Sequence, residues 1–161
     1  MTFYIIIRGY VGIGKTTVAR RLAEGFKGDY VSIDRVLEDN ELDRIEGGCI
    51  PEKNFIKAND LIAQFANSEL NAGKPVVIEG DFYHKYILND LTDKIRFKSY
   101  IFTLKADLED CISRDKKREK GIGEEGIRAV AELTERFDAG KVIDATGKTP
   151  DDTISEILMS L

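Results

Sequence analysis

The chain has 161 residues, 42% hydrophobic and 33% charged, which is an ordinary composition for one globular domain with a sizeable core. Its net charge of −5 argues against a large non-specific nucleic-acid surface, although a local basic patch stays open. Two distant cysteines, Cys49 and Cys111, and a single histidine make neither a disulfide framework nor a zinc site. With no apolar run of membrane-spanning length and a strand starting almost at Met1, we expect a cytoplasmic protein without membrane contact.

Residues 3–27 are the most informative stretch, because they combine a strand, a glycine loop and a helix. Phe3–Ile7 is a continuous apolar run, as expected of a parallel strand that is covered on both faces. The segment GYVGIGKT, from Gly9 to Thr16, fits the phosphate-loop pattern G-x4-G-K-[ST]. An amphipathic helix follows, so the pattern lies in the strand–loop–helix context that phosphate binding requires.

Each residue type in this loop has a chemical reason. Glycines let backbone N–H groups approach phosphate oxygens, and the helix N-terminus behind them favours an anion. The lysine is expected on the β- and γ-phosphates, and the threonine hydroxyl is expected on Mg²⁺. The predicted nucleotide-binding residues are Gly9, Gly12, Ile13, Gly14, Lys15, Thr16 and Thr17, with Lys15 also catalytic and Thr16 also a metal ligand.

The second predicted strand, residues 30–33, is followed at its carboxyl end by Asp34 and Arg35. Ligands bind at the carboxyl ends of parallel strands, so both side chains are expected to look toward the phosphates. Asp34 would orient or deprotonate an acceptor hydroxyl, and Arg35 would hold an anionic acceptor or the transferred group. The alternative is that Asp34 only caps the next helix.

Residues 36–50 predict a helix that breaks into a substrate-covering loop. Residues 52–72 then repeat apolar side chains at helical spacing, which predicts a long amphipathic helix whose aromatic residues belong to the core.

The third strand, residues 76–78, is followed by acidic residues at its carboxyl end. This is the Walker B arrangement, in which an acid holds Mg²⁺ directly or through water. We assign Glu79 as the metal ligand, with Asp81 as the alternative. The predicted acceptor site lies between Asp34, the 40–55 loop and residues 81–83, so Glu79, Asp81 and Phe82 are counted as substrate-binding. His84 is interpreted as a surface residue.

A helix in residues 83–95, with Tyr86 on its apolar face, a strand in 97–104 and a helix from Asp107 follow, with Cys111 as a small core residue. Residues 114–128 combine a basic helix end, a glycine-rich hinge and a second helix, which together predict a small lid. Arg114 and Arg118, four residues apart, would share one helical face and close over the phosphates. The alternative is a solvated helix in which Arg114 pairs with Asp110 and Arg118 with Asp115.

Residues 141–146 form the fifth strand, and a last helix begins at Pro150. Five strands alternating with helices imply a single α/β domain over residues 1–161, with a parallel sheet between two helical layers.

The chain resembles the small P-loop kinases of the nucleoside-monophosphate-kinase-like class. It is most similar to the branch with polynucleotide 5′-hydroxyl kinase, chloramphenicol phosphotransferase and zeta-toxin-like proteins. The resemblance rests on GYVGIGKT, on Asp34–Arg35 and on CISRDKKR (residues 111–118), which looks like the lid segment C-x2-R-[ND]-x2-R of this branch. It implies strand order 2-3-1-4-5, ATP and Mg²⁺, Asp34 as base, and Arg114 against the adenine or phosphates. It further implies Arg118 on the transferred group and Thr146, Gly147 and Lys148 at the adenine edge.

The sequence therefore predicts an ATP-dependent kinase that transfers the γ-phosphoryl group to a hydroxyl of a small acceptor such as a nucleoside, sugar, antibiotic or acid. The turn after the third strand departs from the Gly-Gly-Gly of shikimate kinases, and no guanine-reading motif is present. Two alternatives stay open: a kinase for 5′-hydroxyl polynucleotides or tRNA-linked groups, and a nucleotide-binding switch with no acceptor. We expect a monomer or a homodimer.

Overall fold

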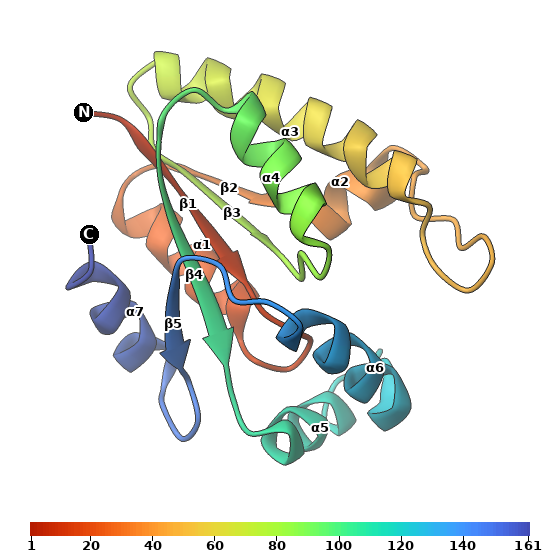
Figure 1. Cartoon of the computed structure of the whole chain (residues 1–161). Coiled ribbons are helices and arrows are strands. Elements are labelled where there is room, and N and C mark those ends of the chain that lie inside the picture. The colour runs from red at the N-terminus through yellow and green to blue at the C-terminus, as the bar shows by residue number, and fades with distance from the viewer.

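The computed structural model describes residues 1–161 and contains one five-stranded parallel sheet (Figure 1). The strand order is β2-β3-β1-β4-β5, and every neighbouring pair runs parallel. The predicted order and sheet type are therefore confirmed. The strands are β1 (Phe3–Arg8), β2 (Asp29–Ser32), β3 (Val76–Gly80), β4 (Lys98–Lys105) and β5 (Lys141–Asp144).

Helices cover both faces of the sheet, so the molecule has three layers. Side chains alternate along β1: Tyr4 and Ile6 join the core beneath α2, α3 and α4, whereas Ile5 and Ile7 join the core beneath α1 and α7, which the inner faces of α5 and α6 complete. This alternation is why the central strand is apolar throughout. The helices are α1 (Lys15–Gly25), α2 (Ile33–Asp39), α3 (Glu52–Asn71), α4 (Lys85–Lys94), α5 (Leu108–Lys116), α6 (Gly123–Glu135) and α7 (Pro150–Leu158).

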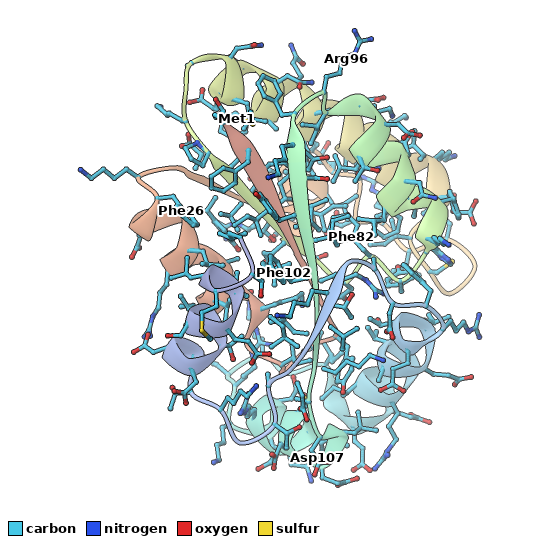
Figure 2. All side chains as sticks on the ribbon, turned by 60° about the vertical axis from the view of Figure 1, so that its left-hand side comes forward. Met1, Phe26, Phe82, Arg96, Phe102 and Asp107 are labelled. Atoms are coloured by element: carbon cyan, nitrogen blue, oxygen red, sulfur yellow. The ribbon has the colours of Figure 1, made fainter.

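All five strands point toward α5 and α6, while both termini lie at the other end of the sheet (Figure 1). Figure 2 shows this polarity on β4, because Arg96 and Asp107 lie at opposite ends of that strand while Phe82 and Phe102 lie in the interior. None of the helices is long and apolar enough to cross a membrane.

Three details differ from the expectations. The second strand ends at Ser32, and α2 begins at once with Ile33. Phe65 on α3 is 42% exposed, because the inner face of that helix is filled by smaller residues such as Ile62 and Ala66. Tyr86, expected on an apolar helix face, is 43% exposed.

Candidate active site

The phosphate loop joins β1 to α1 and has the backbone that its glycines predict. Gly12 and Gly14 have φ angles of +84° and +90°, in the left-handed region that favours glycine. At Gly12 a Cβ atom would lie 2.6 Å from the carbonyl oxygen of Cys111, so a side chain is also excluded by α5. The loop therefore needs glycine for its conformation at both positions and for close packing at Gly12.

A cavity of about 550 Å³ lies in front of this loop, at the carboxyl ends of the strands. Its walls are mostly polar and come from four separate parts of the chain. The lining residues are Val11, Gly12, Gly14, Lys15, Thr16, Thr17, Asp34, Glu79, Arg114, Arg118, Lys120 and Ile122. The fold thus brings together the phosphate loop, the first turn of α2, the end of β3 and the segment after α5.

Lys15 is 7% exposed, and its ammonium lies 2.7 Å from the Asp81 carboxylate. Burial alone would lower the pKa of Lys15, but Asp81 and Glu79 outweigh it and leave the pKa above its usual value. The lysine is therefore charged, and its ammonium is paired with the Asp81 carboxylate.

Glu79 is buried and accepts two hydrogen bonds on one oxygen. The Thr16 hydroxyl donates to Glu79 Oε1 at 3.2 Å, and the Tyr30 hydroxyl donates to the same atom at 2.8 Å. Its second oxygen, Oε2, is buried without a hydrogen-bond partner. A buried carboxylate oxygen without a partner, beside a threonine hydroxyl, fits Mg²⁺ or its water shell. No cluster of three or more acidic, histidine or cysteine side chains could hold a metal alone, so nucleotide oxygens and water would complete such a site.

Asp34 lies in the first turn of α2 and is open to the same cavity as Lys15. Ser32 is the N-cap residue of this helix, so the alternative role of Asp34 as its cap is wrong. Although the Asp34 side chain is solvent-exposed, partial desolvation by the surrounding protein and the nearby Asp81 raise its pKa to about 6, and Lys15 opposes this. A carboxyl with such a pKa takes up and releases a proton close to neutral pH.

The segment from α5 to α6 lies against the phosphate loop. Arg114 Nη1 donates to the Gly12 carbonyl at 3.4 Å, while Arg118 and Lys120 lie in the turn between the helices. The alternative pairings of Arg114 with Asp110 and of Arg118 with Asp115 do not form. Asp115 instead accepts hydrogen bonds from the backbone of Ile122 and Gly123, at 3.1 and 2.9 Å, and so holds the turn.

A smaller cavity of about 230 Å³ adjoins the phosphate loop on the side of α7. Ile13, Thr17, Arg114 and Lys148 line it, and Lys148 also pairs with Glu156 at 2.6 Å. The other two residues expected at the adenine edge do not line this cavity. The Thr146 hydroxyl accepts from the backbone N–H of Asp107 at 2.9 Å, and Gly147 forms a turn with φ +68°.

Two predicted site residues lie elsewhere. Arg35 lines a cavity between α1, α2 and α3, because it follows Asp34 by one helical residue and points about 100° away from it. Phe82 is 5% exposed within the core beneath α3 and α4, and its carbonyl accepts from Arg8 at 3.3 Å. The expectations that Arg35 faces the phosphates and that Phe82 binds the acceptor are thus corrected.

Gly9 serves packing, since a Cβ atom there would lie 3.0 Å from the Leu104 carbonyl oxygen. Sequence reasoning also missed Lys120, which lines the cavity, and two residues that support its walls, Arg8 and Tyr30. Arg8 carried a signal, because it is a charged residue at the end of an apolar strand and directly before the loop. Tyr30 carried none, because its contact with Glu79 spans 49 positions.

A five-stranded parallel sheet in this order with a phosphate loop after the first strand defines a P-loop kinase fold. The chain belongs to the AAA domain family (AAA_33), which matches residues 5–139.

Known proteins bear this out. The chain is 31% identical, over 162 aligned positions, to a Pyrococcus furiosus protein named "Putative adenylate kinase", covering 96% of this chain and 81% of the relative. A sugar kinase from Janibacter sp. HTCC2649 superposes with a TM-score of 0.77 at 19% identity, over 99% of this chain and 94% of the other. A gluconokinase from Sinorhizobium meliloti 1021 superposes with a TM-score of 0.75 at 15% identity, over 97% and 89%. The predicted resemblance to small P-loop kinases, and the enzyme class of phosphotransferase, are confirmed.

Proposed function

We propose that this protein is an ATP-dependent kinase that transfers the γ-phosphoryl group to a hydroxyl of a small-molecule acceptor. The observation that carries the proposal is Asp34, a carboxyl of pKa about 6 that is open to the same cavity as Lys15 and Thr16. A hydroxyl acceptor loses a proton during transfer, and a base with a pKa near neutrality suits that step. A phosphate acceptor is already anionic and needs no base.

The other residues of the cavity supply charge and position. Lys15 would exchange Asp81 for the phosphates when nucleotide binds, while Arg114 and Arg118 would approach from the lid segment and neutralise the transferred group. Ile13, Thr17 and Lys148 would lie beside the nucleobase. Thr16 and Glu79 would hold Mg²⁺, which would bridge phosphate oxygens and offset their charge. Closing the lid segment would keep water, the competing acceptor, away from the phosphates.

A nucleoside monophosphate is the second candidate acceptor, and the relatives named "Putative adenylate kinase" favour it. The geometry favours it less, because Arg35, the basic residue closest in sequence to Asp34, lines a different cavity. The kinase fold and the sugar-kinase and gluconokinase neighbours are consistent with a hydroxyl acceptor.

The two unpaired cysteines fit a reducing cytoplasmic compartment.

The test is transfer of labelled γ-phosphate from Mg-ATP to a panel of acceptors. The panel contains sugars, sugar acids, nucleosides, AMP and a 5′-hydroxyl oligonucleotide, each with wild-type protein, Lys15→Ala and Asp34→Asn. With the correct hydroxyl acceptor, Asp34→Asn should lower transfer by about 10²–10⁴-fold while ATP binding persists. Labelled ADP formed from AMP and insensitive to Asp34→Asn would instead support a nucleoside-monophosphate kinase. Slow phosphate release that is equal across the panel would contradict both and support a switch.

A further inference from the structure

A second cavity lies away from the phosphate loop and is larger than the one there. It has a volume of about 660 Å³ and lies over β2, the outermost strand on this side of the sheet, between α1 on one face and α2 and α3 on the other. It contains no residue of the phosphate loop. A volume of this size is typical of sites for small organic ligands. We call it the edge cavity.

The wall from α3 is apolar and exposed. Leu61 and Phe65 are 41% and 42% exposed, and both line the edge cavity together with the buried Ile62. They lie four residues apart on the helix, so they form one continuous apolar surface. An exposed aromatic side chain inside a cavity marks a place where an apolar ligand gains free energy from burial.

The polar groups of the cavity include two guanidinium groups that have no ion pair. Arg20 of α1 and Arg35 of α2 both line it, and neither lies within 4.0 Å of a carboxylate. Two carboxylates, Glu24 and Asp39, also line the cavity. Guanidinium groups bind carboxylate and related anions with paired hydrogen bonds. The two acidic side chains would repel a ligand with more than one negative charge. We therefore expect a ligand with a single negative charge.

Tyr30 connects the edge cavity to the active site. Its ring lines the cavity, and the Arg20 guanidinium lies 5.2 Å from the ring centroid. Its hydroxyl donates to Glu79 at 2.8 Å, the same oxygen atom that accepts from Thr16. A ligand that shifts the Tyr30 ring or Arg20 would therefore change the hydrogen bonding of the two residues assigned to Mg²⁺.

We propose that the edge cavity is a second ligand site, which takes a small molecule with a planar apolar body and one anionic group, such as an aromatic carboxylate. Binding there changes nucleotide affinity through Tyr30 and Glu79. The effect on nucleotide affinity rests on the proposed function, whereas the existence of the second ligand site does not. The coupling is reciprocal, so nucleotide changes the affinity of the edge cavity by the same factor.

The direct test uses 1-anilinonaphthalene-8-sulfonate, a fluorescent planar monoanion. We expect binding to the folded protein with a stoichiometry of one. In ¹H–¹⁵N spectra, the amide signals of residues 30–36 and 61–65 should shift. Arg35→Gln should weaken binding about tenfold, the loss of a charge-assisted hydrogen bond. Phe65→Gln should weaken it about fivefold, the loss of aromatic contact. The matched controls Arg96→Gln and Leu158→Gln, at exposed positions outside the cavity, should leave it unchanged.

The coupling is tested by titrating Mg-ATP with and without the probe in wild-type protein and in Tyr30→Phe. The variant keeps the ring but loses the hydroxyl, so the probe should still bind while its effect on ATP affinity disappears. Equal loss of probe binding in the control variants, or competitive displacement of the probe by ATP, would overturn the second site. Absence of ATP binding in every protein would contradict the proposed function and leave the direct probe test valid.

Discussion

Asp34 combines a catalytic proposal with a measurable effect on stability. Its pKa is about 6 in the folded protein against an ordinary value of 3.8, so between these values the folded state holds the proton more tightly than the unfolded state. Stability then falls as pH rises from about 4 to about 6, because the carboxylate form is disfavoured only in the folded state. Asp34→Asn removes this dependence. In urea unfolding, the variant should match wild type near pH 4 and exceed it at pH 7.

The opposite result would be a variant that matches wild type at pH 4 but is less stable than wild type at pH 7. It would show that the folded protein stabilises the Asp34 carboxylate. It would remove the physical basis for assigning Asp34 as a base.

Gly12 is the residue where the phosphate loop tolerates least change. Alanine there would adopt a left-handed φ, at about 1–2 kcal/mol, and would press its Cβ atom against the Cys111 carbonyl. Gly73 is a matched control, since its φ of +87° is similar but no atom lies within 4 Å of the added Cβ. Urea unfolding should show Gly12→Ala to cost about 1–3 kcal/mol more than Gly73→Ala. Equal costs would mean that α5 moves away easily from the loop.

At the scale of elements, Asp115 ties α5 to the start of α6. It is 2% exposed and accepts from two backbone N–H groups that begin the second helix. It thus acts as a cap supplied from another helix, at the centre of the proposed lid.

Removing this cap should loosen the lid segment before the rest of the fold. Asp115→Ala is expected to cost about 1–2 kcal/mol and to raise amide exchange in residues 117–126, with weaker ATP binding as Arg118 and Lys120 lose their support. Asp110→Ala, at an exposed acidic position on the same helix, is the control. Unchanged exchange in residues 117–126 would contradict the role of Asp115.

The end of β2 and the start of α2 show which predictions succeeded and which did not. The positions of helices and strands followed from periodicity and from the phosphate-loop motif, which are local signals, whereas the strand order was implied by the resemblance to small P-loop kinases. Asp34 and Arg35 were both expected to face the phosphates because they directly follow the carboxyl end of the predicted strand. It ends at Ser32, and the helix that follows separates their directions. The helix begins at Ile33 instead of after Arg35, and this shift of the helix start, which periodicity does not resolve, decided the outcome for Arg35.

Long-range packing explains the remaining misses. Phe82 turns into the core with φ +46° and packs beside Gly80, where a Cβ atom would approach its ring within 3.0 Å. This depends on contacts that follow only once the sheet and α3 are assembled. The Tyr30–Glu79 hydrogen bond likewise joins neighbouring strands, and its register was not available from either segment alone.

Across the whole molecule, Arg8 connects the segments that build the site. It is fully buried, ends β1 directly before the phosphate loop, and stacks 4.1 Å from the Phe137 ring. It donates to Thr103 Oγ1 and to the carbonyls of Phe82, Thr134 and Phe137 at 2.8–3.3 Å. Burial lowers its pKa to about 10, although Asp138 and Asp81 oppose this, so it stays charged at neutral pH. One guanidinium thereby holds the loop after β3 and the end of α6 beside the phosphate loop.

Lysine at position 8 would keep the charge but lose the planar fork that reaches these oxygens from several directions. Carbonyl groups left without donors in the interior cost about 1–3 kcal/mol each, so Arg8→Lys should lower the free energy of unfolding by about 2–5 kcal/mol. Arg21→Gln is the matched control, because its ion pair with Asp151 is exposed and worth about 0–1 kcal/mol. Amide exchange should rise at residues 134–139 and 80–83 together, since both depend on the same side chain. If only one of these segments responded, Arg8 would be a local packing residue and would not join the two.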